Sequence, residues 1–63
     1  MPPEKYERYL LGDAIDGFTV DVFESGDIHI FSNQSPTEEQ VSLHRVEVDR
    51  LYEILKVQKE AWA

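Results

Sequence analysis

The residues best able to do chemistry are carboxylates, and they gather in one segment of the chain. The stretch from Tyr9 to His44 contains no lysine or arginine, whereas acidic and basic residues balance on either side of it, so it carries the whole formal net charge of -7. Its acidic residues are Asp13, Asp16, Asp21, Glu24, Asp27, Glu38 and Glu39. Carboxylates could hold a metal ion, work as a general acid and base, or attract a basic protein surface.

A calcium site is the first possibility, because the twelve residues from Asp13 to Glu24 have the length of an EF-hand loop. The third and fifth positions of such a loop need oxygen ligands, and the sixth needs glycine. Ile15, Gly17 and Phe18 occupy those positions. The sequence therefore predicts no calcium site in this segment.

Zinc is disfavoured for a different reason. His29 and His44 could join Asp21 or Asp27 as ligands, but zinc takes at least three protein ligands and the two histidines form no spacing motif. The chain has no cysteine, which removes thiolate sites and disulfides. We expect no bound metal ion and no cofactor.

Motifs for nucleophilic catalysis or phosphate binding are also missing. None of the serines lies in a nucleophile elbow. The glycines, at positions 12, 17 and 26, are too scattered for a phosphate-binding loop. A chain of 63 residues has little material to wall a pocket in which one carboxyl could keep a raised pKa. We therefore expect no enzymatic activity.

Length and composition predict one small domain over residues 1–63, with an apolar fraction of 41% that is sufficient for a core. The chain does not open on a secretory signal, and no stretch approaches the roughly 18 apolar residues of a membrane span, so we expect a cytoplasmic protein. Its acidity would repel nucleic acid and anionic lipid. The charge either attracts a protein partner with a basic surface or serves only solubility.

The clearest structural signal is a β-hairpin. Apolar and polar residues alternate from Phe18 to Phe23 and again from Ile28 to Phe31, as in half-buried strands. Asp13 to Gly17, just before the first strand, has the composition of a turn.

Loop length decides the register of this hairpin. A two-residue loop would mix its two faces, whereas a loop from Glu24 to Gly26 sets Val22 opposite Ile28 and Val20 opposite Ile30. A three-residue loop of this kind is a type I turn followed by a residue in the left-handed conformation, here Gly26.

This register creates a second face, on which Asp21 lies directly across from His29. Phe23 and Phe31 share that face. Either the N-terminal segment covers them, or they form an exposed apolar patch rimmed by acids, which is typical of a binding site. The predicted partner-binding residues are Asp13, Asp16, Asp21, Phe23, Glu24, Asp27 and Phe31.

The N-terminal residues 1–12 fit two structures. Pro3 could begin a short helix that stops at Gly12, which is the preferred interpretation. Alternatively, the segment forms an edge strand in which Tyr6, Arg8 and Leu10 point to one side.

The segment after Asn33 also fits two structures. Ser35 to Glu38 resembles a helix start, but one helix from there to the C-terminus would be unusually long for so small a domain. We prefer a strand over residues 40–43, with Val41 and Leu43 inward, followed by a helix over residues 45–61.

That helix carries two apolar stripes, separated by about a third of a turn. The first stripe consists of Val48, Leu51, Tyr52, Leu55 and Trp62, and the second of Val46, Ile54, Val57 and Ala61. One stripe suffices to cover a three-stranded sheet. The second either packs on the N-terminal segment or forms an interface with a second copy or another partner, through Val46, Ile54 and Val57, with Trp62 nearby.

The sequence thus predicts an α+β fold: a three-stranded antiparallel sheet, with a fourth N-terminal strand or a short helix, packed against one C-terminal α-helix. In size, acidity and cysteine-free α+β organisation the chain resembles small phage-encoded inhibitors, such as anti-CRISPR proteins and uracil-DNA glycosylase inhibitors. This resemblance of composition assigns no residues. It implies a module that mimics nucleic acid and blocks a basic surface of a partner. The alternative is a structural protein or accessory subunit that dimerises through its helix.

Overall fold

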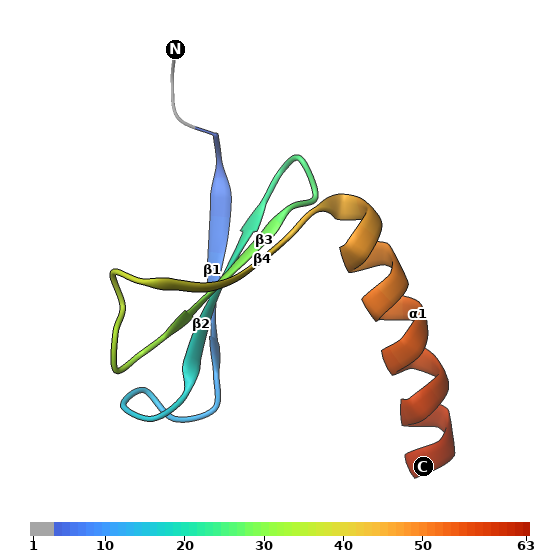
Figure 1. The fold of residues 1–63 in the computed structure, drawn as a ribbon. Coiled ribbons are helices and arrows are strands. Elements are labelled where there is room, and N and C mark those ends of the chain that lie inside the picture. Colours follow the sequence, from blue (N-terminus) through green and yellow to red (C-terminus); the bar gives the residue numbers. More distant parts are fainter. Residues whose placement is uncertain (1–3) are drawn as a thin grey trace.

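A computed structural model describes residues 4–63 and contains a four-stranded antiparallel sheet followed by one helix (Figure 1). The strands occur in the order β1-β2-β3-β4, so each pairs with its neighbour in sequence. Their bounds are β1 Tyr6–Leu11, β2 Phe18–Phe23, β3 Ile28–Ser32 and β4 Glu39–Leu43, and the helix α1 is Arg45–Trp62. The predicted α+β class is confirmed, with four strands in the sheet. Within residues 4–63, the helix α1 is not long and apolar enough to cross a membrane.

The preferred helical interpretation of the N-terminal segment is wrong, because this segment forms the edge strand β1. It pairs with β2 from Tyr6 opposite Phe23 to Leu11 opposite Phe18. Its alternating pattern suits a strand as well as a helical turn, and pairing with β2 satisfies its backbone. Pro3, the expected first residue of the helix, lies outside the described residues.

The predicted hairpin is confirmed in register. Val22 lies opposite Ile28 and Val20 opposite Ile30. The amide of Phe23 donates to the carbonyl of Asp27 at 2.9 Å, which closes the three-residue loop. Gly26 has a φ of 98°, a left-handed conformation that residues with a side chain rarely adopt.

The C-terminal half also follows the preferred interpretation, and no helix starts at Pro36. Strand β4 contains a bulge opposite the Ile30–Phe31 step of β3. The helix begins after a single junction residue, His44, and ends one residue beyond the predicted Ala61.

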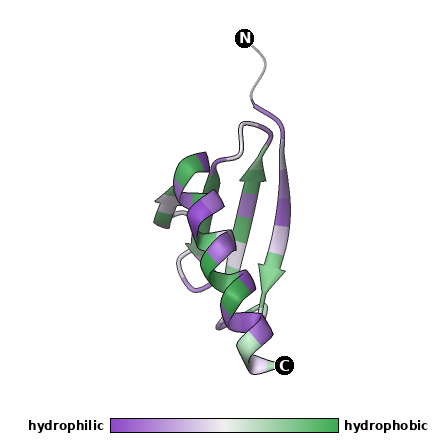
Figure 2. Ribbon diagram, turned by 90° about the vertical axis from the view of Figure 1, so that its right-hand side faces the viewer, coloured by the Kyte–Doolittle hydropathy of each residue, from purple (hydrophilic) through white to green (hydrophobic). Residues whose placement is uncertain are grey.

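The expectation that the helix packs on the sheet is wrong for the single chain. Figure 1 shows α1 leaving the end of β4 and standing apart from the strands. No residue of α1 is buried, and no apolar side chain in the described part of the chain is buried either. Figure 2 shows hydrophobic residues along both the helix and the strands.

The shape agrees with this open arrangement. The radius of gyration is 13.2 Å. A compact domain of this length would have a radius of about 10.6 Å. The sheet and the helix therefore do not close a common core.

Candidate functional site

Most acidic side chains of the predicted site form hydrogen bonds within the chain. Asp21, at 4% exposed, is buried on the second face of the sheet, between Arg8 of β1 and His29 of β3. Arg8 donates from Nε to Asp21 Oδ1 at 2.7 Å and from Nη2 to Oδ2 at 2.9 Å. These hydrogen bonds lower the pKa of Asp21 and raise that of Arg8. Asp21 is thus inaccessible to a partner.

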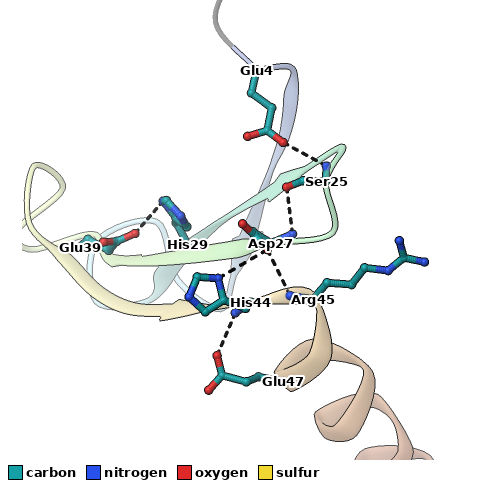
Figure 3. Close-up of polar contacts among 8 residues, drawn as sticks. All are labelled: Glu4, Ser25, Asp27, His29, Glu39, His44, Arg45 and Glu47. Atoms are coloured by element: carbon teal, nitrogen blue, oxygen red, sulfur yellow. Dashed lines mark hydrogen bonds and ion pairs between the residues drawn. The ribbon is translucent and has the colours of Figure 1, made fainter.

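The predicted register, with Asp21 opposite His29, is confirmed, and the His29 side chain contacts a different carboxylate. His29 Nδ1 instead lies 2.6 Å from Oε1 of Glu39, across the β3–β4 boundary (Figure 3). The arginine takes both carboxylate oxygens of Asp21 because its planar fork matches them. The sequence patterns did not predict Arg8 as the partner of Asp21 or Glu39 as the partner of His29. The edge-strand alternative could have indicated Arg8, because a strand over this segment sets Arg8 and Tyr6 on the same face of the sheet.

Two further predicted acids stabilise the turn before β2. Oδ1 of Asp13 accepts the amide of Ile15 at 2.7 Å and that of Asp16 at 3.3 Å, and these bonds lower the pKa of Asp13. Oδ1 of Asp16 accepts a hydrogen bond from Nε2 of Gln34 at 2.8 Å. Both side chains are exposed, but each already has a partner within the chain.

Asp27 joins the hairpin to the start of the helix (Figure 3). Its Oδ1 accepts the amide of Arg45 at 3.1 Å and lies 3.9 Å from Nδ1 of His44. A carboxylate at this position satisfies one of the free amides of the first helical turn and interacts favourably with the helix dipole. Glu24 is exposed, and its backbone amide donates to the carbonyl of Lys5 at 3.1 Å.

The two predicted phenylalanines are half-buried. The ring of Phe23 lies between Tyr6 and His29, with centroid distances of 5.3 and 4.6 Å. The N-terminal strand therefore covers part of Phe23. Phe31 lies opposite Thr19 in β2 and Glu39 in β4.

The larger uncovered surface is on the other side of the sheet, which we call the apolar sheet face. Residues paired across neighbouring strands share a face, and alternate residues of a strand point to opposite faces. Pairing therefore sets Glu7, Tyr9, Leu11, Phe18, Val20, Val22, Ile28, Ile30, Ser32, Val41 and Leu43 together. Glu7 is the single charged member, and none of these apolar side chains is buried.

The helix offers a second uncovered surface. The apolar residues Val46, Leu51, Tyr52, Ile54, Leu55, Val57 and Trp62 are between 39 and 79% exposed. This set includes every predicted interface residue, Val46, Ile54, Val57 and Trp62, together with most of the first stripe. Both stripes are thus open, including the one expected to cover the sheet.

The described residues contain no group of three or more histidine, aspartate or glutamate side chains that could hold a metal ion. The sequence matches no protein-family model and no curated protein, and no solved structure matches the chain. The described residues thus present two apolar surfaces without cover and a set of carboxylates that have partners within the fold.

Proposed function

We propose that this chain is a non-enzymatic protein-binding module that works through its apolar sheet face and its helix. The observation that carries the proposal is the absence of any buried apolar side chain among residues 4–63, combined with many large apolar side chains at the surface. Monomeric proteins rarely leave large continuous apolar patches in water, and such patches mark binding sites. The hydrogen-bonded sheet holds the face in a fixed register.

The experiment is an affinity capture with paired variants. Leu55→Asp adds a charge to the first stripe, and Lys56→Asp makes a larger charge change on the charged side of the same helix. The proposal expects Leu55→Asp to lose at least 90% of the captured protein at high and at low salt, while Lys56→Asp retains it. Equal retention by both variants would contradict the proposal.

A second candidate function is the block of a basic partner surface, as a phage-type inhibitor would act. The charge distribution favours it: α1 carries four acidic and four basic residues, so the whole net charge of -7 lies on the sheet-forming part of the chain. Such a field steers a basic partner and weakens with salt.

The acids that fit this role are those that the fold leaves exposed. Glu24→Lys with Glu38→Lys is the test, because Asp21 and Asp27 have structural partners. The inhibitor role expects capture that is lost at high salt and abolished by the double variant. Unchanged, salt-insensitive capture would leave the acids as a solubility device.

A further inference from the structure

We infer that the apolar sheet face binds the helix of a second copy of this chain, and that two chains exchange helices around a two-fold axis. This inference rests on the proposed function and names its partner. Each chain has one uncovered sheet face and one uncovered helix. A two-fold pair matches the first stripe of each helix with the other chain's sheet and so covers both apolar sheet faces.

The exposed surface area of the chain is large enough for a stable interface with a second copy. The chain exposes 5353 Å² for a mass of 7.3 kDa. Compact monomers follow a scaling that gives about 4,200 Å² at this mass. The excess, about 1,200 Å² per chain, exceeds the roughly 800 Å² that each partner buries in a standard stable interface.

The junction explains why the helix does not cover its own sheet. Only His44, in an extended conformation with ψ of 161°, separates β4 from α1. Its amide donates to Oε1 of Glu47 at 3.0 Å, and Asp27 binds the amide of Arg45. The Arg45 side chain also packs over Gly26, where a Cβ would lie 2.8 Å from its Cγ. These contacts fix the direction in which the helix leaves the sheet (Figure 3).

The two surfaces fit each other in length. The first stripe runs from Val48 to Trp62, about 21 Å at 1.5 Å per residue. Strands of five or six residues extend about 16–20 Å. The stripe can therefore lie along the full length of the face.

Charge selects this arrangement over two stacked sheets. Stacking would bring together two units that each carry -7, whereas the helix is neutral. Helix exchange thus buries apolar surface with less repulsion than stacking of the two acidic sheets would cause.

The test uses the absence of native cysteine. Val20→Cys marks the centre of the apolar sheet face, and Leu55→Cys marks the first stripe. The full chain with both changes is treated with a short bismaleimide and run on a denaturing gel, and its native mass is measured by sedimentation. We expect a native mass of two chains, a two-chain band for the double variant, and little cross-linking of either single variant.

Three results would overturn helix exchange. A two-chain mass in which Val20→Cys alone cross-links efficiently would show stacked sheets. A two-chain mass in which the double variant carries the cross-link between positions 20 and 55 of one chain would place each helix on its own sheet. A native mass of one chain would exclude the dimer.

In that last case, a dye that binds apolar surface separates the inference from the proposed function. A monomer that binds the dye keeps an apolar surface for another polypeptide, so only the dimer fails. A monomer that binds no dye and cross-links within the chain has covered its own face, and both fail. As a further check, Leu55→Asp should weaken the dimer at least 100-fold, whereas Lys56→Asp should change it less than threefold.

Discussion

The sheet and the helix differ in how far their own chain holds them. The sheet is fixed by polar contacts between and within its strands and turns: the ion pair of exposed Arg8 with buried Asp21, the turn at Asp13 and the hydrogen bonds of a registered ladder. The helix is fixed at its first turn alone, and none of its residues is buried. Most of the stability of a helix in a protein comes from packing of its amphipathic side. The comparison teaches that the single chain gives the helix no apolar cover, so we expect the stability of the helix to depend on a partner.

The largest expected effect therefore comes from the exposed helix. Leu55→Asp should lower the free energy of unfolding of the assembled protein by about 3 kcal/mol, because it removes a large apolar group and sets a charge in the interface. Chemical denaturation followed by circular dichroism, at fixed protein concentration, measures this. The matched variant Lys56→Asp should stay within about 0.5 kcal/mol. Equal losses of unfolding free energy for the two variants would mean that neither side of the helix is covered in the assembled protein.

Ile54→Asp sharpens the same measurement by probing the second stripe. If the first stripe alone lies on the partner's sheet, Ile54→Asp should cost less than Leu55→Asp. A larger loss of self-association at Ile54 would instead assign the interface to Val46, Ile54 and Val57.

The next effect lies in the sheet. Gly17 is buried, and a Cβ there would overlap the carbonyl oxygens of Leu11 and Asp13. Gly17→Ala should destabilise the protein by about 2–3 kcal/mol, because backbone atoms would have to move. Gly12→Ala is the control: Gly12 has a φ of 78°, but a Cβ there would meet only the Cα of Gly17 at an ordinary 3.8 Å, so only the conformational cost of about 1 kcal/mol applies. Thermal unfolding measures the stability of both variants. Equal destabilisation would contradict the claim that close packing at Gly17 excludes a Cβ.

The ion pair gives a smaller effect with a defined pH dependence. Asp21→Asn should cost about 1–2 kcal/mol at neutral pH, because it removes the negative charge and one of the two oxygens that accept hydrogen bonds from Arg8. The pKa of Asp21 is lowered in the folded protein, so its contribution is complete above the usual value of 3.8 and is lost as pH falls through the folded pKa.

Denaturation at several pH values checks this. The difference between the original protein and Asp21→Asn should shrink on acidification. Asp16→Asn changes an exposed acid but keeps the side-chain oxygen that accepts the hydrogen bond from Gln34, so it should cost little. A difference that is constant with pH would contradict the role assigned to Asp21.

The smallest effect tests the joint between the two regions. Asp27→Ala should lose about 1 kcal/mol, the usual contribution of a side chain that satisfies an amide at a helix start. Glu24→Ala, in the same loop, should lose less than about 0.5 kcal/mol. Helicity measured by circular dichroism should fall for Asp27→Ala alone. No change in helicity would show that the helix start does not need this contact.

Local patterns in the sequence determined the hairpin and the limits of the helix. A one-residue slip would send every side chain to the opposite face, so the alternation of apolar residues permits one register, with Gly26 in the loop. The start at Arg45 and the two stripes followed from helical periodicity in the same way.

Tertiary structure decided the rest. The segment around Arg8 suits a strand or a helical turn, and the available edge of β2 made the choice. The partners of Asp21 and Asp27 come from distant positions in the chain, so the acidic segment that invited a binding role is partly structural. Amphipathic spacing shows that one side of a helix is apolar, but it does not show which surface covers that side. The direction of the helix after His44 decides this, and it leaves the apolar face of the chain's own sheet uncovered.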